Sequence, residues 1–329
     1  MDKLDIKDKK ILYELDLNAR QPDSEIAKKV GLSRDAVRYR IDKMLNDGYI
    51  KHFTVVVNTM KLGFDWYRLL VRLQNLTVEK EREMMEWLKP RTSYLTKAEG
   101  RWDLIMSAYY RDVYEFRDLL NSFLAEYGDY IAGYDLSVTT RFWHFHRNYL
   151  VGIKEKPMKF EMMGFNEGEP YRYAEIDETD YKVLAVLTKD ARMKTVDIAR
   201  KTGTTEMIVK YRIRKLMDDG VILGFRPLFD TKRLGYIYFK VHFTLRSAAP
   251  NRRKLLFAYV QQYNNSLYAV ESIGGSDFEA HVEVRTTDEL YSYIHSIRSR
   301  FGDIIGDYYF MEYKDEIKWT FLPEMKFVK

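Results

Sequence analysis

Four cationic residues near the start of the chain have the spacing needed to contact DNA. Arg34 and Arg38 lie four positions apart and therefore project from the same side of a helix. Because arginine can donate two hydrogen bonds to the edge of guanine, both are candidates for base recognition in the major groove. Arg40 and Lys43 lie toward the flanks of the same helix and are better suited to phosphate contacts. These residue types predict double-stranded DNA as the partner.

Two short helices joined by a glycine turn are expected to position these side chains. The first helix ends at Gly31, because glycine adopts the left-handed conformation at low cost. Ser33 is the expected N-cap of the second helix, and both Ser33 and Tyr39 join the candidate DNA contacts. The apolar stripes are Ile26, Ala27 and Val30 in the first helix, then Val37, Ile41 and Leu45 in the second. The pattern predicts a helix-turn-helix; the alternative is a solvated helix with ordinary surface charges.

The same pattern occurs a second time, which favours a duplicated domain over a chance arrangement of charges. One constant shift in numbering carries Asp5, Asp8 and Leu12 onto Asp177, Asp180 and Leu184. No gap is needed as far as the Leu-Gly pairs at 62–63 and 234–235. In the second copy the candidate DNA contacts are Thr205, Lys210, Tyr211, Arg212 and Lys215.

Glu206 is the exception, because the first copy has Arg34 at the corresponding position. A carboxylate close to DNA phosphate would weaken or alter the base preference of the second helix, and the target would then be an asymmetric pair of half-sites. The alternative is an acidic residue that favours the helix dipole and points away from DNA.

Composition restricts the class of protein. The chain has 329 residues, which suits two to four small domains, and a net charge of +5, which permits nucleic-acid binding without requiring it. The absence of cysteine excludes disulfides and cysteine-based metal or thiol chemistry. The charged start of the chain and the lack of a long apolar run predict a cytoplasmic protein without a membrane segment.

Beyond each helix-turn-helix, the periodicity predicts a ferredoxin-like β-α-β-β-α-β unit and hence an α+β fold in tandem duplication. Such a sheet carries its helices on one face, and a second copy of the sheet is expected to cover the other. The predicted domains are 1–62 and 176–234 for the DNA-binding units, 63–143 and 235–322 for the ferredoxin-like units, and 144–175 for an extended linker rich in Pro, Gly and charge.

Each half resembles a complete subunit of the Lrp/AsnC transcriptional regulators. The motifs that carry the resemblance are SEIAKKVGLSRDAVRYRIDKMLNDGYIKHF and AEGRWDL in the first half, with VDIARKTGTTEMIVKYRIRKLMDDGVILGF and GGSDF in the second. The resemblance implies a regulator, of archaeal source, in which one chain forms a pseudo-dimer with two sheets packed as a sandwich. Further association of such chains into homo-oligomers is the alternative.

The resemblance also implies that an amino acid or similar small effector binds near a Gly-x-x-Asp loop. The loops of this chain contain Gly100 with Asp103, and Gly274 and Gly275 with Asp277. A plain turn stabilised by its aspartate is the alternative. Trp102 is bulky where the second copy has Ser276, so the second loop is the better candidate for a pocket.

His144 and His146 lie at i, i+2 in RFWHFHRNY and leave an enzymatic alternative open. They either pack at the tail of the last strand or ligate a metal or haem. Sirohaem decarboxylases share the Lrp/AsnC fold and use histidine and arginine near a tetrapyrrole. The cationic recognition helices favour a regulator that is not an enzyme and has no cofactor. A third class is an interaction module that kept the fold but does not bind DNA.

Overall fold

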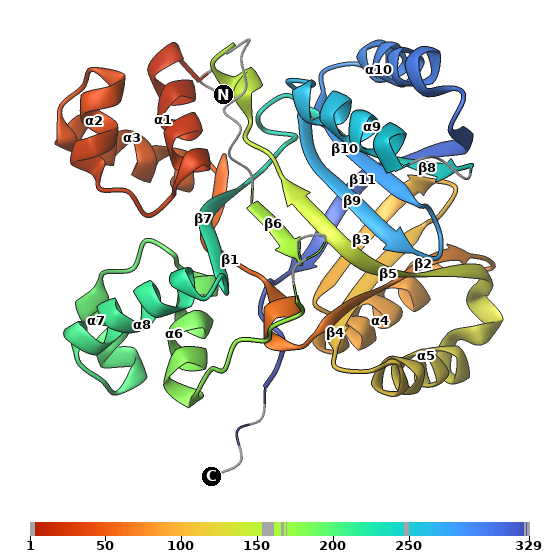
Figure 1. Ribbon diagram of the computed structural model, residues 1–329, viewed down its shortest axis with the longest axis horizontal. Helices are drawn as coiled ribbons and strands as arrows, with labels where there is room; N and C mark the ends of the chain where they lie inside the picture. Colours follow the sequence, from red (N-terminus) through yellow and green to blue (C-terminus); the bar gives the residue numbers. More distant parts are fainter. Residues whose placement is uncertain are drawn as a thin grey trace.

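The computed structural model describes residues 4–152, 161–165, 168, 170–246, 250–325 and 327. Each copy begins with three helices that form a compact head, and both heads lie on the same side of a large β-structure (Figure 1). The heads consist of α1 (Ile6–Leu17), α2 (Asp23–Val30) and α3 (Arg34–Asn46), and of α6 (Glu178–Lys189), α7 (Thr195–Thr202) and α8 (Glu206–Asp218). Among the described residues, no helix is both long and apolar enough to cross a bilayer.

Both copies contain the predicted β-α-β-β-α-β order. In the first copy the elements are β2 (Asp65–Leu73), α4 (Val78–Leu88), β3 (Tyr94–Gly100), β4 (Leu104–Tyr110), α5 (Val113–Tyr127) and β5 (Ile131–His144). In the second they are β8 (Ile237–Leu245), α9 (Pro250–Gln262), β9 (Ser266–Ile273), β10 (Phe278–Val284), α10 (Thr287–Phe301) and β11 (Ile305–Trp319). Single 3-10 turns lie at Thr59–Leu62, Lys89–Arg91, Gly128–Tyr130 and Asn148–Leu150.

The two sheets join into one closed barrel, which corrects the expectation of two separate sheets stacked as a sandwich. The strand order β2-β4-β3-β11-β8-β10-β9-β5 returns to its start because β5 also pairs with β2. The copies meet where β11 pairs with β3 and where β5 pairs with β9, both antiparallel. The long strands β5 and β11 extend beyond their own sheets and reach the opposite copy. The sequence indicates where such strands lie, but it does not indicate that β5 and β11 pair with strands of the other copy.

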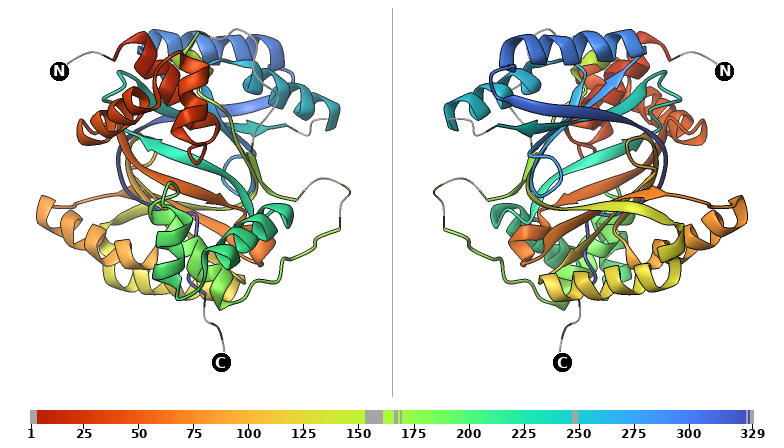
Figure 2. Two further views of the ribbon diagram at one scale, coloured as in Figure 1. Left: turned by 90° about the vertical axis from the view of Figure 1, so that its left-hand side faces the viewer. Right: turned by 90° about the vertical axis from the view of Figure 1, so that its right-hand side faces the viewer.

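Helices cover the outside of the barrel, α4 and α5 on one side and α9 and α10 on the other (Figure 2). Side chains alternate along each strand, so one set packs under the helices and the other faces the lumen. In β8, Phe239, Val241 and Phe243 belong to the core beneath the helices. Lys240 and His242 face inward, where the lumen also holds the buried polar side chains of Arg68, Glu279 and His281.

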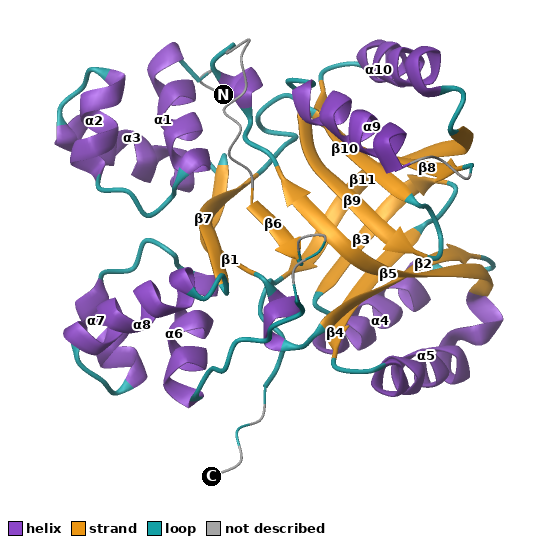
Figure 3. Ribbon diagram, viewed as in Figure 1, coloured by secondary structure: helices purple, strands orange, loops and turns teal. Residues whose placement is uncertain are grey.

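A two-stranded ribbon lies between the barrel and the heads (Figure 3). It consists of β1 (Ile50–Val57) and β7 (Ile222–Phe229), one from each copy, in antiparallel pairing. Each head packs on the strand of the other copy: Ala19 N donates to Phe225 O at 2.8 Å, and Ala191 N donates to Phe53 O at 3.0 Å. The two heads are therefore held by the same ribbon.

The stretch 144–175, predicted to be an extended linker, contains structure that the sequence did not indicate. β6 (Glu161–Gly164) pairs with the end of β5, and the Asn58 side chain bonds the backbone N–H and C=O of Gly164. This pairing places β6 beside the ribbon. The KEKPMKF segment at 154–160 lies outside the described residues.

Candidate nucleic-acid interface and the charged interior

Local sequence signals shape both helix-turn-helix units. Gly31 and Gly203 end α2 and α7 with φ of +66° and +69°, the left-handed conformation that glycine adopts without strain. Ser33 Oγ accepts from Ala36 N at 3.2 Å, and Thr205 Oγ1 accepts from Ile208 N at 3.3 Å. Both residues thus cap the second helix. The predicted stripe of α3 is buried at Val37 and Ile41, but its third member is Met44 rather than Leu45, which is half-buried.

The exposed side of α3 presents the base-recognition candidates. Arg34 and Arg38 are exposed, and Tyr39 is 69% exposed. Arg34 contacts Asp35 at 3.2 Å, with both side chains largely in solvent, so this pair costs little to rearrange. Lys43 is also exposed at the far end of the helix. The first head therefore offers two arginines and a tyrosine on one surface.

Three of the residues predicted to contact DNA form ion pairs within their own heads. Arg40 contacts Asp5 at 2.8 Å and Asp8 at 2.7 Å, at the N-terminus of α1. Hydrogen bonds to these carboxylates raise the pKa of Arg40. In the second head, Arg212 contacts Asp177 at 2.7 Å and Lys215 reaches Asp180 at 3.4 Å. These ion pairs hold each recognition helix against the first helix of its head. The sequence spacing gave no sign of them, because the partners lie more than thirty positions away in the chain.

The second recognition helix presents a different surface. Glu206 contacts Lys210 at 2.6 Å and accepts from Thr195, and the hydrogen bond with Lys210 lowers the pKa of this carboxyl. Met207 is 78% exposed and Tyr211 62% exposed, with Ile208 beside them. Met207, Ile208 and Tyr211 correspond to Asp35, Ala36 and Tyr39 of the first copy. The second recognition helix therefore has more exposed apolar surface than the first, and its Lys210 is paired with Glu206.

The predicted effector loops have satisfied carboxylates. Asp103 accepts from Leu73 N at 2.8 Å and contacts Arg72 at 3.1 Å. Asp277 accepts from Leu245 N at 2.7 Å. The Ser276 hydroxyl bonds His242 rather than facing an open pocket. Gly100, Gly274 and Gly275 have φ of +136°, +82° and +65°, so they serve sharp turns against neighbouring strands. This geometry is that of the turn-stabilising alternative.

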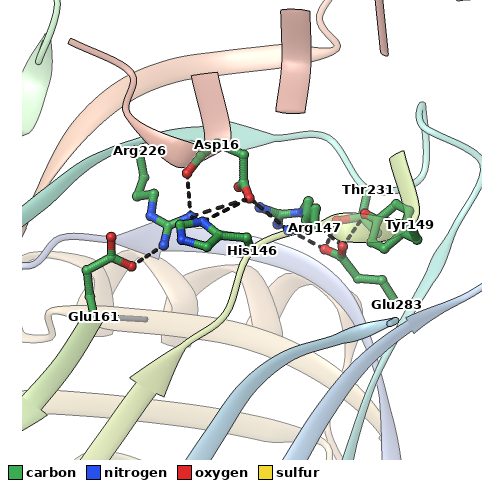
Figure 4. Close-up of polar contacts among 8 residues, drawn as sticks. All are labelled: Asp16, His146, Arg147, Tyr149, Glu161, Arg226, Thr231 and Glu283. Atoms are coloured by element: carbon green, nitrogen blue, oxygen red, sulfur yellow. Dashed lines mark hydrogen bonds and ion pairs between the residues drawn. The ribbon is translucent and has the colours of Figure 1, made fainter. Parts of the chain in front are cut away.

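A buried network of charges connects the first head, the ribbon and the barrel (Figure 4). Asp16, at the end of α1, contacts Arg147 at 3.0 Å and Arg226 of β7 at 3.3 Å, and all three side chains are buried. Burial would raise the pKa of Asp16, but Arg226, His146 and Arg147 lower it below its usual range. Arg226 also pairs with Glu161 of β6, and Arg147 contacts Glu283 of β10 at 2.9 Å and 3.0 Å. Buried ion pairs between side chains thus hold the first head against the barrel.

Inside the barrel, Arg68 of β2 and Glu279 of β10 form a second buried ion pair, which joins the two copies. The two guanidinium nitrogens donate to the carboxylate at 2.9 Å and 2.6 Å. Burial would raise the pKa of Glu279, yet Arg68, His242 and His281 hold it well below its usual range. Burial lowers the pKa of His281 to about 3. Neutral His281 then donates through Nε2 to Glu279 and accepts at Nδ1 from Tyr238.

Lys240 lies in the same lumen, and burial lowers its pKa to about 7. At a pH between this value and the ordinary pKa of 10.5, Lys240 is protonated in the unfolded chain but neutral in the folded one. The free energy of unfolding should therefore rise with pH across pH 7 to 9. Lys240→Met is expected to flatten this rise and to stabilise the protein at pH 7 by about 1–4 kcal/mol, because an apolar side chain of similar size has no charge to desolvate. Urea unfolding at pH 7, 8 and 9 measures both effects. The exposed Lys89→Met is the control; the same flattening in both variants would contradict the assignment.

The two histidines of RFWHFHRNY are packed inside the molecule. The His144 ring lies 4.6 Å from that of Tyr268, on the strand paired with β5, and burial lowers its pKa well below the ordinary value. His146 Nδ1 lies 2.8 Å from Arg226 in the network of Figure 4. The described residues contain no cluster of three or more His, Asp or Glu suited to a metal ion. These positions agree with the packing role.

Sequence reasoning missed the charged lumen, although a signal was present. Glu279, His281 and Glu283 alternate with apolar residues along β10, as Lys240 and His242 do along β8. Such alternation usually marks a strand with one solvated face. Closure of the barrel buries that face, and closure depends on pairing between copies that lie far apart in the sequence.

The fold and the capped, glycine-linked helices define a winged helix-turn-helix DNA-binding class. A family model for winged helix-turn-helix DNA-binding domains matches residues 4–51 and 176–222. An uncharacterized HTH-type transcriptional regulator of Pyrococcus furiosus is 34% identical over 121 residues, which are 36% of this chain and 79% of that protein. The HTH-type transcriptional regulator AldR of Mycobacterium tuberculosis is 29% identical over 136 residues, 41% of this chain and 76% of AldR. The chain belongs to the Lrp/AsnC family of transcriptional regulators.

One solved structure is similar to the whole chain rather than to one copy. The crystal structure of the siroheme decarboxylase NirDL has a TM-score of 0.62, with 12% sequence identity, and covers 95% of this chain and 92% of that one. At this identity the similarity concerns the fold. The similarity extends over both copies of this chain. The regulators, by contrast, align with less than half of this chain, as expected for a duplication.

Proposed function

We propose that this chain binds duplex DNA through both heads at once, as a regulator in which one polypeptide forms the pseudo-dimer. The observation that carries the proposal is the pair of capped recognition helices held by one ribbon, with Arg34 and Arg38 exposed on the first. Two heads fixed relative to one another should contact half-sites about one helical turn, or a multiple of it, apart. Further association of such chains remains compatible with this arrangement.

Titration against the promoter region of its own gene tests the proposal. Contacts to phosphate release counterions, so affinity should fall steeply, by roughly tenfold or more between about 50 and about 200 mM salt. Fluorescence anisotropy with a labelled duplex measures the slope. Binding that is weak at both salt concentrations would reject DNA recognition and favour an interaction module.

The second head is proposed to recognise thymine methyl groups. Met207, Ile208 and Tyr211 expose apolar surface at the start of α8, where a helix-turn-helix approaches base edges. Replacing thymine by uracil in the half-site of this head removes only a methyl group and should weaken binding about fourfold per contact, from the loss of about 0.8 kcal/mol. Anisotropy with matched duplexes measures the effect. The same replacement in the other half-site should change little, and Met207→Ala should reduce the difference between the half-sites; equal losses at both half-sites would contradict the assignment.

The proposal includes the absence of enzymatic activity. The structural similarity to a siroheme decarboxylase is a reason to test this directly, by adding iron-uroporphyrin III and recording the Soret band. Internal packing of His144 and His146 supports a protein that does not ligate haem through them. A shifted Soret band that is lost in a His146→Ala variant would favour the enzymatic alternative. An amino acid or similar small effector, and a cytoplasmic location, remain parts of the proposed role.

A further inference from the structure

We propose that the barrel lumen is a binding site for a small carboxylate with a flat apolar body. The carboxylate lies at Lys240, Trp66 and Trp319, and the apolar body lies among the tyrosines at the mouth of the barrel. This site is separate from the Gly-x-x-Asp loops. Its existence does not depend on DNA binding, whereas its effect on DNA binding rests on the proposed function.

The inner end of the lumen collects hydrogen-bond donors that lack acceptors. The indole nitrogens of Trp66 and Trp319 are buried without a hydrogen-bond partner, and Trp66 is 95% buried, being only 5% exposed. The ammonium group of Lys240 lies over the rings of Tyr94 and Tyr313, at 5.1 Å and 4.0 Å from their centroids. The described part of the chain gives it no hydrogen bond or ion pair. The three residues line one small pocket of about 20 Å³.

Four other cations around this lumen have carboxylate partners within the described residues. Arg68 is paired with Glu279, and Arg147 with Glu283. Lys51 reaches Glu316 at 3.7 Å, and Lys314 contacts Glu312 at 2.7 Å. Lys240, by contrast, has Glu279 and Glu316 in its surroundings but no direct carboxylate partner among the described residues, so a ligand can supply one. An acceptor with negative charge forms the stronger hydrogen bonds with such donors, which selects a carboxylate oxygen over a neutral group.

A cleft of about 390 Å³, large enough for a small molecule, neighbours this space. The two spaces share their walls at Tyr94, Tyr238, Tyr268 and Trp319. These rings offer a flat apolar surface directly outside the donors, so a ligand with a ring one or two bonds away from its carboxylate can occupy both spaces.

The outer wall of the cleft is formed by the ribbon and its flanks. Lys51 of β1, and Leu228 and Phe229 of β7, contribute to it. Arg147 and Glu283, at the same wall, continue into the network that holds Asp16 of the first head (Figure 4). A ligand in the cleft therefore contacts the element that fixes the spacing of the two heads, and we infer that its occupancy changes operator affinity.

Calorimetric titration of the full chain with 3-phenylpropionate tests the site. The matched probe 3-phenylpropanamide has the same size without the charge and should bind about tenfold to a hundredfold more weakly. Lys240→Met should produce a similar loss for the carboxylate, and Trp66→Phe, which removes the indole N–H but keeps a ring, a smaller loss. Lys89→Met should leave binding unchanged. Near pH 8, ligand binding should be coupled to protonation of Lys240 in the wild type but not in Lys240→Met. This coupling is measured as a binding enthalpy that depends on the ionisation enthalpy of the buffer.

Three results would overturn the site: equal binding of acid and amide, unchanged binding in Lys240→Met, or no heat with acetate, benzoate and 3-phenylpropionate at 10 mM. The last would mean that a single water satisfies the donors, since the inner space suits one water. Operator affinity is measured with and without saturating 3-phenylpropionate. Bound ligand with unchanged DNA affinity would overturn the coupling alone, and failure of DNA binding in the absence of ligand would overturn the proposed function while leaving the carboxylate titration intact.

Discussion

Replacing Arg38 by alanine is expected to weaken operator binding about fivefold to a hundredfold, because a bidentate contact with guanine contributes about 1–3 kcal/mol of discrimination. Arg38 is exposed on α3, and no ion pair holds it within the described residues, so its full donor capacity is available to DNA. Specificity should relax at one guanine of the first half-site, whereas the salt slope should change only slightly. Anisotropy titrations with the operator and with single-base variants measure both.

Lys210→Ala is the matched change in the second head. Lys210 forms an ion pair with Glu206 at 2.6 Å, and its ammonium group lacks the planar pair of donors that arginine has. Its loss should therefore weaken operator binding by about 1 kcal/mol, or about fivefold, without a change in base specificity. Circular dichroism checks that both variants keep their helices. Equal losses from Arg38→Ala and Lys210→Ala, with the same effect on specificity, would contradict an asymmetric operator.

Features that depend on a few neighbouring residues could be predicted from the sequence. The turn at Gly31 and the cap at Ser33 follow from backbone conformations that these residue types favour, so both recognition helices begin where expected. The order of strands and helices in each copy follows from periodicity in the same way. Duplication strengthened each prediction, because the same signals appeared twice.

Features that depend on distant partners could not be predicted. Arg40 has the position of a phosphate contact, and only the packing of α3 on α1 reveals its pairing with Asp5 and Asp8. The closed barrel depends on pairing between β5 and β9, and that closure turns an expected solvated face into the charged lumen. The candidate carboxylate site is invisible in the sequence for this reason, since Trp66, Lys240 and Trp319 come from three strands in two copies.

The ion pair between Arg68 and Glu279 should have the largest effect on stability. Glu279→Ala is expected to lower the free energy of unfolding by about 3–5 kcal/mol, because it leaves the buried Arg68 guanidinium without a counter-charge. Urea unfolding followed by circular dichroism measures the loss. Since the pair joins strands of the two copies, the variant should also separate the transitions of the two halves.

The double variant Arg68→Met, Glu279→Ile tests whether Glu279→Ala is unstable because it leaves Arg68 unpaired or because it removes packing and hydrogen bonds. The first copy has Ile105 at the position that corresponds to Glu279, and this residue is buried in the same lumen. An isoleucine side chain at position 279 is therefore expected to pack in the lumen as Ile105 does. Removal of both charges avoids their desolvation and should restore stability to within about 1–2 kcal/mol of the wild type. A double variant as unstable as Glu279→Ala would mean that the hydrogen bonds to Ser137, Ser272 and the histidines, rather than the balance of charge, hold the two copies together.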